Sequence, residues 1–255
     1  MPVKKEVIHI NNNIKLYLGN SNELIKDIPD NSVDLIVIDP PYLLNMSGGK
    51  KGTSDIAKTL LSLEKELTEV NLVNGYDMTI LDDLVRVMNK INIYIWCNIA
   101  QIKSYLDYFI GKLDCSFEIL IWNKTNAMPL FNNKYLSDKE YCLYFRKRGY
   151  CNPPTYQKGK TVFCLPTTQK EKKKYHHPTI KPLSIIERFI ENSSRENETI
   201  LDCFMGSGTT GEAVVNIGGN RKFIGMEINE EYYNTAKERI EEAIRNKEDE
   251  SNEIW

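Results

Sequence analysis

The sequence lacks the residue patterns that build metal centres and disulfide frameworks. Its six cysteines lie at positions 97, 115, 142, 151, 164 and 203, none of them forms a Cys-x-x-Cys pair, and only three histidines accompany them. Neither a zinc site nor a set of disulfides is therefore expected, and a reducing cytoplasm is the predicted location. The sequence also has no signal-peptide pattern and no apolar run long enough to cross a bilayer, so we expect a soluble protein without a membrane partner.

The sequence is also short of net charge, but its charge is unevenly distributed. A net charge of −2 argues against a general polyanion binder. Residues 146–181, however, hold ten basic residues against one acidic residue, a local charge of +9, with aromatic residues interleaved. This basic segment predicts a polyanion-binding surface built on loops and one short strand over 161–164, with a solvated basic loop as the alternative. The candidate residues of that surface, DNA-binding if the polyanion is DNA, are Arg146, Lys147, Arg148, Lys158, Lys160, Lys172, Lys173 and Lys174.

The remaining pattern alternates strands and helices, which predicts an α/β fold. With 255 residues and 41% apolar residues, the chain suits one domain with a sizeable core. Predicted strands are 7–10, 14–18, 33–38, 91–97, 117–122, 141–145, 199–203 and 222–226, with 117–122 and 141–145 as an antiparallel edge. Helical spacing or capping predicts helices at 21–28, 56–67, 80–88, 102–112, 183–191, 209–215 and 230–245. Residues 43–53 predict a mobile loop beside the site, and 246–255 a frayed end.

The apolar run 33–38 ends directly in Asp39-Pro40-Pro41-Tyr42. Each proline fixes φ and removes an N–H, and the residue before a proline is held extended, so the chain leaves the sheet stiffly. The Asp39 carboxylate and the Pro40 carbonyl then offer two acceptors beside the Tyr42 ring. This set suits a planar base with an exocyclic amine, adenine or cytosine, stacked on the tyrosine. A Pro-Pro turn that merely ends a buried strand is the alternative.

A second strand, 199–203, runs into Phe204-Met205-Gly206-Ser207-Gly208-Thr209-Thr210. The two glycines allow close backbone approach, and ligands of open α/β sheets bind at such a strand end. The run lacks the full dinucleotide spacing and a Gly-Lys-Ser/Thr, which disfavours a pyrophosphate or a nucleoside triphosphate. Glu227 ends the following strand, where α/β nucleoside binders hold ribose hydroxyls. A tight turn with a surface glutamate is the alternative.

These two runs, with His177-Pro178-Thr179-Ile180-Lys181-Pro182 before the second, resemble the motifs of S-adenosylmethionine-dependent DNA amino-methyltransferases. The resemblance covers about residues 17–239, and the catalytic motif precedes the cofactor motif, as in the permuted group called the β class. Aspartate at position 39 is similar to the N6-adenine members of the family. The sequence departs from the family at Gly19-Asn20, where Gly-Asp is common, so an amide or another group would read the adenine edge of the cofactor.

The resemblance implies a Rossmann-like sheet, mostly parallel with an antiparallel edge, in a single domain over 1–255 with a target-recognition insertion at about 146–176. It implies methyl transfer from S-adenosylmethionine to N6 of a flipped adenine in DNA, with no metal. The implied catalytic residues are Asp39, Pro40, Pro41 and Tyr42. The implied cofactor residues are Asp39, Lys181, Asp202, Phe204, Gly206, Ser207, Gly208, Thr209 and Glu227.

Other readings stay open at this point. Segments 122–126 and 137–140 are similar to segments that line the base pocket in the family, although ordinary loop polarity explains them equally well. A cytosine-N4 methyltransferase would use the same residues, and an RNA or protein methyltransferase or a non-catalytic DNA-binding module are further alternatives. The resemblance leaves a homodimer and a cognate restriction nuclease as partners to be tested beside DNA.

Overall fold

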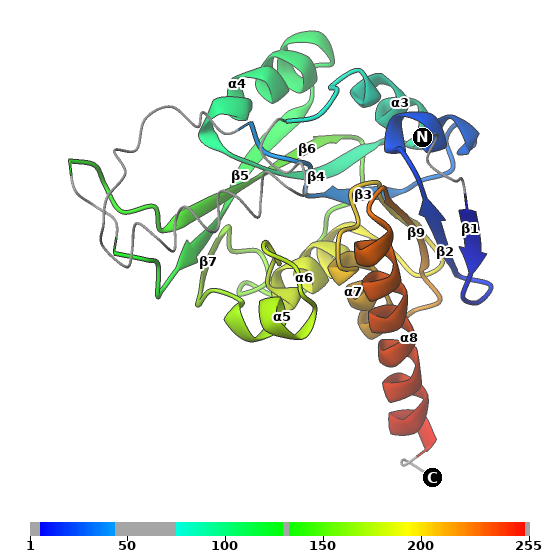
Figure 1. The fold of residues 1–255 in the computed structure, drawn as a ribbon. Coiled ribbons are helices and arrows are strands. Elements are labelled where there is room, and N and C mark those ends of the chain that lie inside the picture. The colour runs from blue at the N-terminus through cyan, green and yellow to red at the C-terminus, as the bar shows by residue number, and fades with distance from the viewer. Residues whose placement is uncertain (1–5, 44–74, 130–132, 253–255) are drawn as a thin grey trace.

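The computed structural model describes residues 6–43, 75–129 and 133–252, and its centre is a mixed β-sheet (Figure 1). The strands lie side by side in the order β1-β2-β9-β8-β3-β4-β6-β5-β7. Their bounds are β1 Glu6–His9, β2 Ile14–Leu18, β3 Leu35–Ile38, β4 Ile91–Cys97, β5 Ser116–Lys124, β6 Lys139–Lys147, β7 Val162–Leu165, β8 Thr199–Asp202 and β9 Lys222–Glu227. The predicted helix over 56–67, and the predicted loop 43–53 beyond its first residue, fall outside the described ranges.

Most neighbouring strands run parallel, as predicted. The pairs β2·β9, β8·β9, β3·β8, β3·β4 and β5·β7 are parallel, whereas β1·β2, β4·β6 and β5·β6 are antiparallel. The antiparallel edge is therefore β1. The predicted antiparallel pair of β5 and β6 is present, but it is not at the edge of the sheet, because β7 is the edge strand and pairs parallel with β5. Because β3 lies between β8 and β4, the chain connections diverge at this strand, which is where open α/β sheets bind their ligands.

Helices cover both faces of the sheet (Figure 1). One face carries α1, α3 and α4, and the other carries α6, α7 and α8. Their bounds are α1 Ser21–Leu24, α3 Ile80–Val87, α4 Ile99–Leu106, α5 Gln169–Lys174, α6 Leu183–Ser193, α7 Thr209–Ile217 and α8 Glu230–Asn252, with a 3-10 turn at Ile25–Asp27 and a π-helical stretch at Asp107–Lys112. No helix within the described ranges is long and apolar enough to traverse a bilayer.

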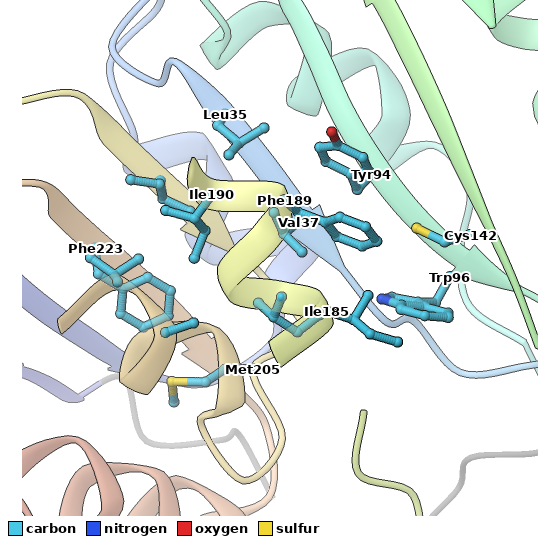
Figure 2. Close-up of a cluster of buried hydrophobic side chains, with 14 of the residues drawn as sticks. Leu35, Val37, Tyr94, Trp96, Cys142, Ile185, Phe189, Ile190, Met205 and Phe223 are labelled. Carbon is cyan, nitrogen blue, oxygen red and sulfur yellow. The ribbon is translucent and has the colours of Figure 1, made fainter. Parts of the chain in front are cut away.

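Two hydrophobic clusters, one on each face, fix the sheet. All four residues of β3 are buried, as a strand covered on both faces requires. On the α6 face, Phe189 stacks on Tyr94 with ring centroids 4.2 Å apart (Figure 2). Ile185 and Phe189 are four positions apart, so both point from α6 toward the strands. This packing sets the height of α6, and with it the segment just before α6, relative to the end of β3.

Three helices differ from the sequence prediction. The segment 169–174, predicted as loop, forms α5, and α8 continues to Asn252 although residues from 246 were expected to fray. The segment 169–174 consists of lysine, glutamate and glutamine, which are good helix formers, whereas 246–252 continues a long helix that is already formed. Helix α4 begins at Ile99 rather than 102, because Asn98 and Gln101 form a capping box. Local propensity and capping therefore decided these helix ends.

Candidate active site

The carboxyl ends of β2, β3, β4, β8 and β9 meet at one edge of the sheet, and a cavity of about 370 Å³ lies there. Its volume is in the range of small-ligand sites. Residues of both predicted motifs line it: Asp39 and Pro41 from the first, and Phe204, Gly206, Ser207 and Thr209 from the second. The cavity also takes in Asp202, Glu227 and Lys181. The fold therefore brings together two motifs that lie about 160 residues apart in the sequence.

Asp39 is half-buried at the mouth of this cavity. Its Oδ2 accepts a hydrogen bond from Lys181 Nζ at 2.5 Å. Its Oδ1 is buried and has no hydrogen-bond partner among the described residues. Burial raises the pKa of Asp39 above its ordinary value, and the ammonium of Lys181 opposes that rise. One oxygen is thus held by Lys181, and the other carries no hydrogen bond within the described residues, although the Tyr42 hydroxyl also acts to lower the pKa of Asp39.

Lys181 belongs to an alternating row of charges. Its Nζ lies 3.2 Å from Glu140 Oε2, and Lys124 Nζ lies 2.5 Å from Glu140 Oε1. Only 6% of the Lys181 side chain is exposed. Burial lowers the pKa of Lys181, but the two carboxylates outweigh it and hold the pKa above the ordinary value. Burial likewise opposes ionisation of Glu140, and the two lysines lower the pKa of Glu140 to about 2.

Aromatic rings enclose the Lys181 ammonium. Nζ lies 5.3 Å from the centroid of the Tyr42 ring and 5.2 Å from that of Trp96, distances typical of cation–π contacts. Trp96 also lines the cavity, and its Nε1 is buried with no hydrogen-bond partner in the described part of the chain. The site therefore presents an unpaired donor as well as the unpaired Asp39 acceptor.

Helix α4 anchors the backbone of the first motif. Gln101 donates from Nε2 to the Pro41 carbonyl at 3.2 Å, and the same side chain completes the capping box with Asn98. The Tyr42 carbonyl accepts from the Gly75 N–H at 3.2 Å. Because the prolines have no N–H, these bonds to carbonyls are the means by which the motif is fixed to its neighbours.

The second motif turns tightly at its glycines. Gly208 has φ +82°, and a Cβ there would lie 2.8 Å from the Ala236 Cα on α8. Gly206 has φ +51° and donates its N–H to Glu227 Oε2 at 2.8 Å. Both positions require a left-handed conformation that side chains resist. Arg239 of α8 then donates to the Thr209 hydroxyl at 2.9 Å, which holds the start of α7.

Asp202 and Glu227 are the buried carboxyls of the cavity. Asp202 accepts from the Thr210 hydroxyl at 2.6 Å and from the Phe204 N–H at 3.0 Å, yet burial raises the pKa of Asp202 to about 7. Burial also raises the pKa of Glu227, against three backbone N–H groups that donate to it. A carboxylate oxygen accepts more than one hydrogen bond, so both groups can still bind a ligand.

His177 completes the wall next to Gly206. It is buried and its ring lies 4.3 Å from that of Tyr232, centroid to centroid. Burial, assisted by the charge of Lys181, lowers the pKa of His177 to about 4, so the imidazole is neutral near pH 7. A Cβ on Gly206 would lie 3.1 Å from His177 Nε2. Because glycine has no Cβ, the turn at Gly206 can pack closely against His177 in the motif before α6.

The structure places the other predicted residues as follows. Gly208 packs against α8, and Pro40 and Tyr42 are not among the residues that line this cavity, although the Tyr42 ring faces Lys181. Glu140 and Lys124 lay outside the predicted catalytic set, and no role was predicted for Trp96. Glu140 and Lys124 carried a signal, namely polar residues at predicted strand ends. Trp96 carried little, because an aromatic residue in an apolar strand reads as core.

The predicted basic surface is divided between the two ends of the sheet. Arg146 pairs with Asn92 and Lys147 with Ile91, at the start of β4, whereas the catalytic motif lies at the strand ends. Arg148 follows them, and Lys158 is ion-paired with Glu191 near the end of α6. Lys160 adjoins Lys158 in the same loop. Because β6 runs antiparallel to β4, it carries Arg146 and Lys147 away from the site, and contact of these residues with DNA stays a prediction.

Helix α5 keeps its lysines at the catalytic end. It ends at Lys174, three positions before His177, which lines the cavity. Lys173 is exposed on α5, and Lys174 forms a partly exposed ion pair with Glu242 at 3.0 Å. Lys172 also lies on this helix. These three of the predicted DNA-binding residues remain candidates for contact with a substrate at the cavity.

Comparisons with known proteins agree with this site. A family model for N6/N4 methyltransferases, described as DNA methylase, matches residues 33–238. The Type II methyltransferase M2.MboI of Moraxella bovis is 31% identical over 248 residues, which cover 90% of this chain and 88% of that protein. M2.LlaDCHI of Lactococcus lactis subsp. cremoris, also a Type II methyltransferase, is 32% identical over 244 residues, covering 89% of each. The chain belongs to the N6/N4 family of DNA methylases.

A solved structure shows the same architecture. The complex of M1.HpyAVI with SAM is 27% identical, with a TM-score of 0.64, and the match covers 89% of this chain and 99% of that one. DNA methylases of this family use S-adenosylmethionine, which confirms the predicted cofactor. The cavity fits it: the glycine turn leaves room for a close ligand, and Asp39 Oδ1 and Trp96 Nε1 are unpaired polar atoms in its wall. When bound, S-adenosylmethionine supplies an electrophilic methyl group.

Proposed function

We propose that this DNA methyltransferase modifies the exocyclic N6 amine of adenine at specific sites in DNA. The observation that carries the proposal is the Asp39 carboxylate, with one oxygen held by Lys181 and the other buried and unpaired. An acceptor of this kind beside the Pro40 carbonyl suits an amine with two hydrogens. Aspartate at this position, rather than serine or asparagine, supports adenine over cytosine by resemblance to the N6 members of the family.

The residues of the site divide the work. Asp39 Oδ1 and the Pro40 carbonyl accept the two amine hydrogens, which draws the nitrogen toward a tetrahedral shape and frees its lone pair. Tyr42 offers a ring on which the base stacks after it rotates out of the duplex. Asp202, Glu227 and the glycine turn hold the cofactor. Positioning of this kind can supply up to about 7–11 kcal/mol of the barrier reduction.

DNA is proposed to approach across α5. Lys172, Lys173 and Lys174 lie on a helix that ends three positions before the cavity residue His177, so they suit contacts to phosphates near the target base. This narrows the predicted recognition segment 146–176 to its second half. A cognate restriction nuclease, in keeping with the Type II relatives, and a homodimer stay predictions.

The test is nucleoside analysis of the reaction product. The purified protein is incubated with unmethylated DNA and methyl-labelled S-adenosylmethionine, and the digested DNA is analysed by mass spectrometry. We expect N6-methyladenine, abolished by Asp39→Asn and retained by Asp107→Asn, a change of the same kind on the exposed end of α4. Detection of N4-methylcytosine instead would show that cytosine, not adenine, is the target base. Cofactor binding without any labelled nucleoside would contradict DNA amine methylation altogether.

A further inference from the structure

We infer that Glu140 and Lys124 are positioning residues for methyl transfer: they fix the Lys181 ammonium, which holds Asp39 Oδ2 and so leaves Oδ1 for the target amine. This inference rests on the proposed function only in requiring an exocyclic amine as the acceptor of the methyl group. It holds equally for adenine and for cytosine. Neither Glu140 nor Lys124 lines the described cavity, so both act through Lys181.

Geometry is the first support. The row Asp39, Lys181, Glu140 and Lys124 draws one residue each from the end of β3, the segment before α6, the start of β6 and the end of β5. Four separate elements therefore converge on one line of alternating charge. Lys181 is 6% exposed, and Tyr42 and Trp96 flank it. The buried ammonium cannot turn toward solvent, so the Glu140 carboxylate, together with Asp39, determines its position.

Charge balance is the second support. If Lys181 were paired with Asp39 alone, it would stabilise the ionised carboxylate strongly. The carboxylate would then be a weaker acceptor for a ligand, because the ammonium would donate its hydrogen bonds to Asp39 only. Glu140 shares the ammonium, and Lys124 in turn shares Glu140. The row as a whole is neutral, with two carboxylates and two ammonium groups. In such a neutral row Lys181 favours the ionised form of Asp39, while Glu140 opposes it and holds the ammonium from the other side.

Other titratable groups surround Asp39, and the test must separate them from the row. Those coupled to Asp39 are Lys181, Glu140, Tyr42, Tyr105, Cys97, Cys142 and Asp202. Burial keeps the tyrosines and cysteines of this set neutral near pH 7, since it raises the pKa of each. Asp202 has a pKa of about 7 and therefore changes charge in the same range as the assay. Its effect is common to all variants and cancels in their comparison.

The experiment uses two single variants whose effects have opposite sign. Glu140→Gln removes a negative charge near Asp39, so the acid limb of the single-turnover methyl-transfer rate should move to lower pH. Lys124→Met removes a positive charge one position further along the row, so the limb should move to higher pH. We expect shifts of about one pH unit and about half a unit, respectively. The double variant should lie between the two.

A direct reading of Asp39 accompanies the rates. In protein labelled with carbon-13 at the aspartate carboxyls, the Asp39 resonance is assigned by its loss in Asp39→Asn, and its titration is followed in each variant. The two variants should move its midpoint in the same opposite directions. The conservative changes Glu140→Asp and Lys124→Arg should restore most of the rate lost in Glu140→Gln and Lys124→Met.

Matched controls come from α8, where Lys237 and Glu241 form a partly exposed pair 4.0 Å apart. Lys237→Met and Glu241→Gln repeat the same charge changes and should leave both titrations unchanged. Shifts of the same sign in Glu140→Gln and Lys124→Met, or no shift in the Asp39 resonance, would overturn the inference. Its failure is distinguishable from failure of the proposed function, because the methylated nucleoside is identified separately in wild-type product.

Discussion

His177 makes the stability of this methyltransferase depend on pH in a calculable way. The pKa of His177 is lowered from 6.5 to about 4 in the folded protein. Between these values the unfolded chain binds a proton that the folded chain does not, so stability falls as the pH falls. The contribution of His177 is fully present above pH 6.5 and is lost as the pH falls toward about 4. The full loss amounts to roughly 3 kcal/mol.

The measurement is urea unfolding of the cofactor-free protein and of His177→Gln at pH 7 and at about pH 4.5. Glutamine keeps an acceptor for the Thr179 N–H, which His177 Nδ1 accepts at 3.3 Å. Wild type should lose roughly 2.5 kcal/mol more than the variant between the two pH values. Asp202, whose raised pKa acts in the opposite direction, is present in both proteins and cancels. Equal pH dependence in the two proteins would refute the reasoning.

Two further predictions concern the glycine turn and the divided basic segment. Gly208→Ala should destabilise the fold by about 2–4 kcal/mol, measured by urea unfolding, because φ is +82° and the new Cβ would lie 2.8 Å from the Ala236 Cα. The exposed change Lys170→Gln together with Lys173→Gln on α5 should weaken DNA binding and reduce the slope of log affinity against log salt by up to about 2. Arg148→Gln, at the far end of the sheet, should leave that slope unchanged in the same titration.

Much of the fold was predictable because its signals are local. The strand that ends in Asp39, the glycine turn from Gly206 to Gly208 and the helix beginning at Thr209 each follow from residue types within a few positions. The exceptions among the helices were the start of α4, where a capping box was missed, and α5 and the end of α8, where charged runs were interpreted as loop or frayed chain. The composition of a charged run does not reveal whether it is helical, because the same residues suit a solvated loop.

The two motifs, their order and the cofactor class were determined by the sequence alone, because each depends on a short run whose backbone conformation its own prolines or glycines impose. Only the tertiary structure decided which charges reach Asp39. Lys181, Glu140 and Lys124 come from distant segments, and strand order and direction place them together. The same antiparallel β6 brings Glu140 at its start into the site and carries Arg146 and Lys147 at its end to the opposite edge of the sheet. Sequence proximity says nothing about this separation, since it arises from the direction of one strand relative to its neighbours.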